Sequence, residues 1–506
     1  MKILKFGGSS IGDSEKALNV ISILKNSIKK SDGIAIIFSA FQGVTDQLIK
    51  TSYDASIGDS KYIEMFHDIE KKHISIAKSL IPVKSQSGII ANIKLRINEL
   101  EDVLHGVFLV REISQRTQDF ILSFGERLSC YIITHALIER KIKCEFLDSR
   151  QLIITDDSFG NAKVNFEPTY KNIKLYFKSH KAIQVITGFI GSTVNKETST
   201  LGRGGSDYTA SIFAAALNAS ETEIWTDVDG VLTADPKKVK KAFSLEQITY
   251  EEAMELSHFG AKVIHPPTMQ PAMNKKIPIR IKNTFNPSFP GTLISDKANS
   301  KNFSIKGISS IDDISLLLIQ GGGMIGVAGT AERIFKALAA KKINITLITQ
   351  ASSEHSLCLA VMPQFALSAK RAIEDELYYE IKDKLINPPV IENDLSIIAV
   401  VGENMRNTPG VSGKIFQALG KNGIKNISKD VLDPNVSPVI TKEMLDELTH
   451  KVVVESIEKR ADQDKLTGEW IVYAKENNSN YYLGIWRHDA GDEKIAKAIK
   501  DTCLPE

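Results

Sequence analysis

Residues 3–39, ILKFGGSSIGDSEKALNVISILKNSIKKSDGIAIIFS, contain the pattern that decides the fold. The apolar run at 3–6 predicts a strand, two glycines follow it, and helical periodicity extends over about 13–29. Residues 34–39 then predict a second strand. A strand, a helix and another strand in this order indicate a parallel βαβ unit, in which the helix covers one face of a sheet.

The same alternation continues to about residue 295. Helical periodicity dominates residues 62–140. Four further strands are expected, at residues 143–147, 183–187, 223–226 and 278–281. This order predicts an α/β domain, residues 1–297, with a mainly parallel central sheet sandwiched by helices. A stretch with Pro and Gly follows at 286–291, and we place the domain boundary near 296–303.

An internal repeat follows this boundary. SLLLIQGGGMIGVAGTAERIFKALAAKKINI begins at Ser315, and SIIAVVGENMRNTPGVSGKIFQALGKNGIKNI begins at Ser396, about 81 residues later. Met324 of the first copy aligns with Met405 of the second. Each copy predicts a strand, a loop, a helix and a strand, so we interpret this region as a duplicated module.

Residues 438–506 repeat neither pattern. They contain a charged helical stretch near 444–462, a predicted hairpin formed by 469–475 and 481–486, and a short final helix. The composition is that of a folded segment, but no motif in it indicates a chemistry. We therefore expect a C-terminal appendage of unknown role.

Composition excludes several classes of protein. The chain has 506 residues, 42% hydrophobic and 25% charged, which is typical of soluble globular domains. With 63 Lys and Arg against 61 Asp and Glu, it lacks the basic excess of a nucleic-acid or membrane-surface binder. The four cysteines form no C-x-x-C pair, which argues against a disulfide framework or a zinc site. We expect a cytoplasmic protein with no nucleic-acid or membrane partner and no bound metal centre.

Common catalytic signatures are absent or incomplete. No G-x-x-x-x-G-K-[ST] phosphate loop and no H-E-x-x-H occur. A G-x-S-x-G string at 8–12 has no evident His or acidic partner. A G-x-G-x-x-G string at 321–326 follows a predicted strand, but no acidic residue follows at the end of the next strand, so a close-approach turn is the simpler interpretation.

Two glycine-rich turns indicate anion binding. In KFGGSS, residues 5–10, exposed N–H groups and the following helix could bind a phosphate, with Lys5 as a point charge; a plain turn with a surface Lys is the alternative. In TLGRGGSDY, residues 200–208, Arg203 offers a bidentate donor for a carboxylate or phosphate. Asp207 could cap the next helix or orient a cation. WTDVDG, at 225–230, also follows a strand, and the carboxyl ends of parallel strands meet at one sheet edge.

Seven motifs together carry a family resemblance: KFGGSS, SFGERLS, TGFIGS, TLGRGGSDYTA, WTDVDGV, TADP and FGAKVIHP. In order and spacing they resemble the aspartate kinases of the amino-acid kinase superfamily, over about residues 1–435. The resemblance implies an amino-acid kinase fold followed by ferredoxin-like βαββαβ ACT modules within residues 303–437. It also implies transfer of the γ-phosphoryl group of ATP, with Mg²⁺, to the β-carboxylate of L-aspartate. The product, 4-phospho-L-aspartate, opens the biosynthesis of lysine, threonine and methionine.

The resemblance assigns roles to individual residues. Lys5 would neutralise the transferring phosphoryl group and Asp207 would hold the lysines in place. The ATP site would comprise Lys5, Gly7, Gly8, Ser9, Thr226, Asp227, Leu232, Lys237 and Lys262. The aspartate site would comprise Ser39, Thr45, Glu126, Arg203 and Ser206, with Glu126 for the ammonium and Arg203 for the α-carboxylate. Leu232 stands where relatives often have Tyr, and Lys237, where many have Arg, keeps the charge without a bidentate grip.

The implied chemistry agrees with the missing signatures. The nucleophile would be the β-carboxylate of aspartate, whose pKa of about 3.9 leaves it ionised at neutral pH, so no general base is needed. Positioning and neutralisation of phosphate charge would supply the catalysis.

The C-terminal region departs from the family pattern. The first copy, about 312–380, offers Met324, Gln350, Ser352, Ser353 and Glu354 as effector-binding residues, for lysine or threonine. The second copy, about 393–430, leaves the pattern before completing a module. The resemblance implies a homo-oligomer through the ACT region, but regulation and dimer assembly stay open here. Two other functions also stay open: a non-catalytic amino-acid sensor, and a kinase of another acid such as glutamate or N-acetylglutamate.

Overall fold

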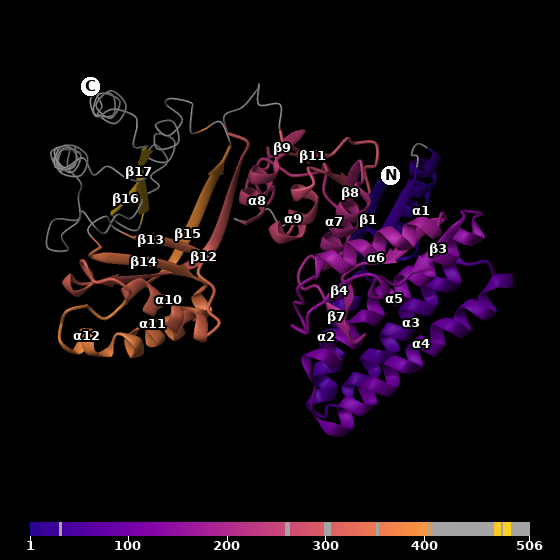
Figure 1. Cartoon of the computed structure of the whole chain (residues 1–506), viewed down its shortest axis with the longest axis horizontal. Coiled ribbons are helices and arrows are strands. Elements are labelled where there is room, and N and C mark those ends of the chain that lie inside the picture. Colours follow the sequence, from indigo (N-terminus) through magenta and orange to yellow (C-terminus); the bar gives the residue numbers. More distant parts are fainter. Residues whose placement is uncertain are drawn as a thin grey trace. The chain divides into compact units, whose positions relative to one another are not determined.

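The computed structural model describes residues 1–29, 33–258, 264–297, 305–350, 354–402, 405, 470–476 and 479–486. The chain divides into two compact units (Figure 1). The first comprises Met1–Ser310 and Ile398–Glu403, and the second comprises Ile311–Ile397 and Asn404–Glu506. Each unit is described by itself below.

An eight-stranded sheet forms the centre of the first unit. Its order is β3-β5-β2-β1-β8-β10-β11-β9. The strands are β1 (Lys2–Phe6), β2 (Ile34–Phe38), β3 (Cys144–Leu147), β5 (Ile183–Thr187), β8 (Glu221–Thr226), β9 (Gln247–Thr249), β10 (Ile279–Asn283) and β11 (Thr292–Ser295). From β3 to β10 all neighbours pair in parallel, β11 pairs with β10 antiparallel, and β9 pairs with β11 in parallel. The predicted parallel sheet is therefore confirmed.

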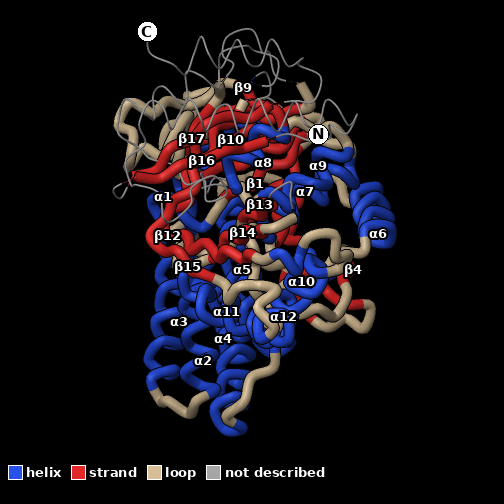
Figure 2. The backbone as a smooth tube through the Cα atoms, turned by 90° about the vertical axis from the view of Figure 1, so that its left-hand side faces the viewer, coloured by secondary structure: helices blue, strands red, loops and turns tan. Residues whose placement is uncertain are grey.

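Helices cover both faces of this sheet (Figure 2). They are α1 (Ser14–Lys29), α2 (Val44–Ser56), α3 (Lys61–Leu80), α4 (Val83–Val110), α5 (Gln115–Glu139), α6 (Phe166–Ser179), α7 (Gly205–Leu217), α8 (Tyr250–His258) and α9 (Pro266–Asn274). Leu4 and Phe38 belong to one apolar core with residues of α1 to α5. Ile3 and Ile37 belong to a second core with residues of α6 to α9. Because successive strand residues point to opposite faces, a strand between two cores must be apolar throughout, as the buried run of β2 is.

A small second sheet lies in the same unit. It contains β4 (Ile154–Thr155), β6 (Ile190–Thr193) and β7 (Thr198–Thr200), in that order. β6 and β7 pair antiparallel. These short, polar strands were not expected from the sequence, and neither was the antiparallel addition of β11.

The second unit contains most of a four-stranded sheet of order β13-β14-β12-β15. Its elements are β12 (Gly307–Gln320), α10 (Thr330–Ala340), β13 (Leu347–Gln350), β14 (Ser356–Val361), α11 (Pro363–Glu376), α12 (Tyr378–Lys382) and β15 (Val390–Val401). Apart from the short α12 this is βαββαβ, with the first strand between the third and the fourth, as in ferredoxin-like modules. The expected module fold is therefore confirmed for the first copy.

β15 has two places in this arrangement. It is the fourth strand of the first module, and it contains Ser396, where the second sequence copy begins. Asp313 in β12 and Asp394 in β15, also about 81 residues apart, both have positive φ angles, 55° and 59°. The backbone irregularity thus repeats with the sequence. After β15 the second copy lies outside the described residues, apart from residue 405.

The predicted C-terminal hairpin is confirmed. β16 (Trp470–Glu476) and β17 (Ser479–Trp486) pair antiparallel, with an irregularity between Val472 and Tyr473. The helical stretch expected near 444–462 lies outside the described residues.

Candidate active site

The carboxyl ends of four adjacent strands meet at one edge of the large sheet. Phe6 of β1 is paired with Phe38 of β2 and Trp225 of β8, and Asn283 of β10 is paired with Thr226. The segments that follow these strands therefore emerge at the same level. In open α/β sheets ligands bind at this edge.

Lys5 and Asp207 form an ion pair at this edge. Lys5 Nζ lies 2.6 Å from Asp207 Oδ1, and Lys5 is only 8% exposed. Lys5 comes from β1, whereas Asp207 lies in the first turn of α7. The carboxylate therefore fixes the ammonium beside the turn that begins at Gly7.

The turn after β1 is anchored to both neighbouring segments. Gly7 N donates to Trp225 O at 3.2 Å, and Ser10 Oγ lies 2.7 Å from Thr284 Oγ1. A Cβ at Gly8 would lie 2.9 Å from Ala40 O, so a larger residue would push the two segments apart. Ser9 belongs to the same short 3₁₀ helix, Gly8–Ile11. A Cβ at Gly7 would lie 3.6 Å from Lys5 Nζ, so the turn passes close to the ammonium group.

Glu126 presents a carboxyl group to the same region from α5. It is 3% exposed, and its Oε1 accepts a hydrogen bond from Ala40 N at 3.0 Å. Its Oε2 is buried and has no hydrogen-bond partner among the described residues. Burial raises the pKa of this carboxyl to about 8, against the opposing effect of the Ala40 N–H and of the Lys5 charge. The group is therefore suited to receive a cation that the protein itself does not supply.

The glycine-rich loop before α7 exposes Arg203. Gly202 and Gly204 on either side of it both have φ of +71°, in the left-handed region that glycine favours. Ser206, the second residue of α7, is buried against Gly188, where a Cβ would lie 2.6 Å from Ser206 Oγ. Arg203 is therefore exposed to solvent, whereas Ser206, just after the loop, is tightly packed.

The remaining predicted site residues lie just after β2, in α2, and in or after β8. Ser39 follows β2 and donates its N–H to Phe6 O at 3.2 Å, and Thr45 lies half-buried in the first turn of α2. Thr226 Oγ1 donates to Asp227 Oδ1 at 3.1 Å at the end of β8. Leu232 forms an isolated bridge with Ser244, and exposed Lys237 donates its N–H to Asp235. Lys262 lies outside the described residues.

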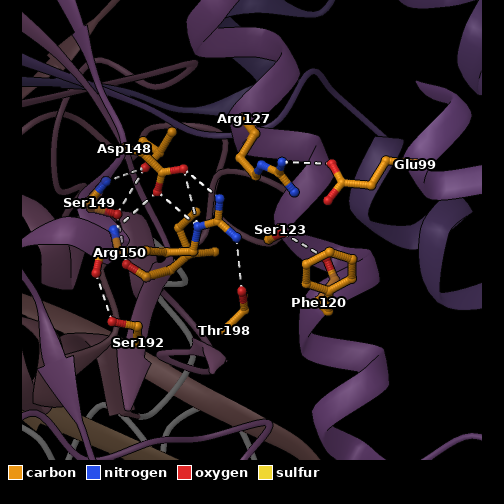
Figure 3. Close-up of polar contacts among 11 residues, drawn as sticks. Glu99, Phe120, Ser123, Arg127, Asp148, Ser149, Arg150, Ser192 and Thr198 are labelled. Atoms are coloured by element: carbon orange, nitrogen blue, oxygen red, sulfur yellow. Dashed lines mark hydrogen bonds and ion pairs between the residues drawn. The ribbon is translucent and has the colours of Figure 1, made fainter. Parts of the chain in front are cut away.

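Next to Glu126, the buried Arg127 lies near a second group of charged side chains (Figure 3). Arg127 Nη2 donates to Glu99 Oε2 at 3.0 Å, and its guanidinium lies 4.3 Å from the Phe124 ring. Burial and the nearby Arg150 lower the pKa of Arg127. Arg150 is in turn held by Asp148 through contacts of 2.7 to 3.1 Å. Of these contacts, the Arg127–Glu99 ion pair joins α5, which carries Glu126, to α4.

Sequence reasoning missed three contributors to this site. Ala40 supplies a backbone N–H to Glu126, Gly188 makes room for Ser206, and Asp119 binds the segment before Arg203. The TGFIGS motif contains Gly188, so a signal for it was present. Nothing in the sequence indicated Asp119 or Ala40, because their contacts join residues 81 and 86 positions apart.

The second unit contains a pocket of about 320 Å³ beside the start of α10. Of the predicted effector residues, Met324, Gln350 and Glu354 line it, together with residues 326–331. Glu354 Oε2 accepts a hydrogen bond from Gly326 N at 2.9 Å. Ser352 and Ser353 lie outside the described residues.

Two kinds of site are absent from the described residues. These residues contain no group of three or more His, Cys, Asp or Glu side chains placed to hold a metal ion. Within the same residues no helix combines the length and apolarity needed to cross a membrane.

Known proteins of one family resemble this chain. The model of the amino acid kinase family matches residues 1–283, and an ACT domain model matches 317–377 and 398–447. The bifunctional aspartokinase/homoserine dehydrogenase of Buchnera aphidicola is 35% identical over 449 residues, 88% of this chain and 55% of that protein. This chain spans about half the length of such bifunctional relatives.

Two further proteins are matched by this chain over a larger share of their own length. Chloroplastic aspartokinase 1 of Arabidopsis thaliana is 30% identical, over 87% of this chain and 77% of its own length. The crystal structure of E. coli aspartokinase III in complex with aspartate and ADP superposes with a TM-score of 0.70 and 27% identity. The superposition covers 83% of this chain and 92% of the aspartokinase III chain.

Proposed function

The chain belongs to the amino acid kinase family and, within it, to the aspartokinases, and we propose that it transfers the γ-phosphoryl group of ATP to the β-carboxylate of L-aspartate. The observation that carries this proposal is the Lys5–Asp207 ion pair at the carboxyl edge, directly before the turn at Gly7 and Gly8. A fixed cation next to backbone N–H groups suits a phosphoryl group on which negative charge accumulates.

The aspartate would lie between Glu126 and Arg203. The carboxyl group of Glu126 has one free, buried oxygen for the ammonium, and Arg203 stands exposed for the α-carboxylate. Ser39, Thr45 and Ser206 would contribute hydroxyls around it. An aspartate held in this way would direct its β-carboxylate toward Lys5, and the site would favour aspartate over a monocarboxylic acid.

The nucleotide would lie along the ends of β1 and β8. Gly7, Gly8 and Ser9 would receive its phosphates, and Thr226, Asp227, Leu232, Lys237 and Lys262 would line the rest. Magnesium would be held mainly by phosphate oxygens, as is usual for this ion in kinases, and this fits a site whose described residues form no carboxylate cluster. When bound, the ion neutralises phosphate charge.

The decisive experiment is trapping of the acyl phosphate as its hydroxamate, with ATP, magnesium and L-aspartate. Lys5→Ala is expected to lower the rate by roughly a thousandfold or more, because a buried cation at the phosphoryl group is lost. Lys174→Ala, an exposed lysine of α6, is the matched control and is expected to retain full activity. A folded wild-type protein that forms no hydroxamate with aspartate, glutamate or N-acetylglutamate would instead support an amino-acid sensor.

The pocket of the second unit is proposed as the binding site of a feedback effector, lysine or threonine. Glu354 could attract its ammonium group, and the N–H groups at the start of α10 could receive its carboxylate. Inhibition curves with each amino acid, for wild type and Glu354→Ala, test this. Curves that stay flat for both would contradict it. Homo-oligomer formation through the ACT region is proposed with it, and light scattering at several concentrations measures it.

A further inference from the structure

The strand that leads into the Arg203 loop is held at both ends by charged side chains. β7 is only three residues long, Thr198–Thr200. Thr198 Oγ1 accepts from Arg150 Nη1 at 2.9 Å, as Figure 3 shows. At the other end, Thr200 donates both its N–H and its hydroxyl to Asp119 of α5, at 2.8 and 2.9 Å.

Asp119 has a third donor from another part of the chain. Its Oδ2 also accepts from Gly160 N at 2.9 Å, and the side chain is 1% exposed. Burial raises the pKa of this carboxyl, whereas the three hydrogen bonds lower it. The segment around Gly160 lies close to the Arg203 loop, because a Cβ at Gly202 would collide with Asn161. One buried carboxylate thus joins α5, β7 and the segment that packs against the loop.

The same helix also carries Glu126. Asp119 and Glu126 are seven residues apart on α5, close to two full helical turns, so they lie on one face of the helix. The helix that presents the carboxyl group for the substrate ammonium is thereby bonded to the strand that presents Arg203 for the substrate carboxylate.

We propose that Asp119 is a positioning residue, which fixes Arg203 relative to Glu126 and so sets the affinity for aspartate. This inference rests on the proposed function. Asp119 touches neither substrate in this arrangement; it acts through Thr200 and the loop that follows. The expected signature is a change in KM for aspartate without an equal change in KM for ATP, since the turn at Gly7 and Gly8 is anchored elsewhere.

The donor pattern predicts which substitution is tolerated. In Asp119→Asn, the amide oxygen can replace Oδ2 and accept both N–H groups, and the amide nitrogen can donate to the Thr200 hydroxyl, which rotates to accept. In Asp119→Ala, two buried N–H groups lose their acceptor. Thr200→Val removes only the hydroxyl and keeps the backbone bond.

The experiment measures steady-state constants for the full chain. Asp119→Ala is expected to raise KM for aspartate by about tenfold or more, Thr200→Val by about threefold, and Asp119→Asn by less than about twofold, with KM for ATP within about twofold throughout. Asp59→Ala is the control, because Asp59 also accepts a backbone N–H group, from Lys61, but stands before α3, a helix that carries neither Glu126 nor Arg203. It is expected to leave both constants unchanged.

Hydrogen exchange separates this inference from the proposed function. Backbone amides of residues 198–205 are expected to exchange faster in Asp119→Ala and Thr200→Val, but not in Asp119→Asn or Asp59→Ala. A wild type that phosphorylates no amino acid would refute the proposed function, and the positioning role would then be judged by exchange and by calorimetry of aspartate binding. Parallel rises in both KM values, no rescue by Asn, or unchanged exchange at 198–205 would each overturn the inference.

Discussion

Three charged side chains at the carboxyl edge of the large sheet, those of Lys5, Asp207 and Glu126, are largely buried, whereas those in the βαββαβ module stand largely in solvent. Lys5, Asp207 and Glu126 have at most 14% of their side-chain or residue surface exposed. In the module, Glu354 is exposed, and Arg333 pairs with Glu376 at 2.9 Å with 41% of its side chain exposed. Charges interact strongly where water is excluded and weakly where it is present. Substitutions in the two regions should therefore differ in magnitude.

After Lys5→Ala, the largest effect is expected from Asp207→Asn. This change removes the countercharge of a buried ammonium and frees Lys5 to move away from the phosphoryl group. A fall in kcat of roughly a hundredfold or more is expected in the hydroxamate assay. Asp102→Asn, on the exposed face of α4, serves as the control. If Asp207→Asn kept its kcat, the buried pair would be structural and the contrast between the two regions would lose its functional meaning.

A second effect concerns acid stability and His73. This side chain of α3 is fully buried, its Nδ1 lies 2.7 Å from Ile69 O, and burial lowers its pKa to about 4. The unfolded chain protonates near pH 6.5, so between pH 6.5 and 4 unfolding gains a proton and stability falls, by about 3 kcal/mol in total.

Urea unfolding of the full chain at pH 7, 5.5 and 4.5 measures this. His73→Leu is expected to make the free energy of unfolding of the first unit depend less on pH between 6.5 and 4. His67→Ala is not expected to do so, because 59% of the His67 side chain is exposed. If the free energy of unfolding fell equally with pH in wild type and in His73→Leu, this buried histidine would not be the cause of the acid sensitivity.

A third effect concerns the pH dependence of aspartate binding. Because the pKa of Glu126 is raised to about 8, its ionised fraction falls about tenfold per pH unit below that value. KM for aspartate is expected to rise as pH falls from 8 to 6, by up to about tenfold per unit. Glu126→Gln should raise KM and remove this slope. A wild-type KM independent of pH over this range would contradict the prediction.

The smallest effect is expected in the module. Arg333→Ala removes the ion pairs with Glu376 and Glu380, yet the cost in free energy of unfolding should stay below about 1 kcal/mol and shrink in high salt. Calorimetry of the full chain, with Arg371→Ala as the exposed control, measures it. A loss as large as that for His73 protonation would mean that exposure alone does not explain the difference between the regions.

Elements with a clear local pattern of apolar residues were predicted from the sequence, and elements without one were missed. β2 is a continuous apolar run and β1 is interrupted within residues 3–6 only by Lys5, so both strands were identified, β2 with one residue too many at its end. β7, with the sequence TST, has neither an apolar run nor alternation and was missed. β12 was expected only from Ser315, because the Asp pair before it interrupts the apolar pattern, but the strand begins at Gly307.

Within the candidate site, residue types were easier to predict than contacts. The family motifs contain Lys5, Asp207, Glu126 and Arg203, and the structure brings Lys5 and Asp207 into contact. The unpartnered Oε2 of Glu126 depends on burial by elements from several parts of the chain, which no local pattern encodes. The hydrogen bonds of Asp119 likewise depend on how α5 packs against β7.

Because β15 belongs to both copies, the border between the duplicated sequence copies does not coincide with the border of the folded βαββαβ module. A cut placed where the second copy begins, at Ser396, would divide β15 and leave the sheet edge at β12 without its complete neighbour. Unpaired edges of this kind invite association with other strands. Excising or exchanging either copy therefore requires borders chosen by strand pairing, so each copy limits how far the other can be deleted or replaced by recombination.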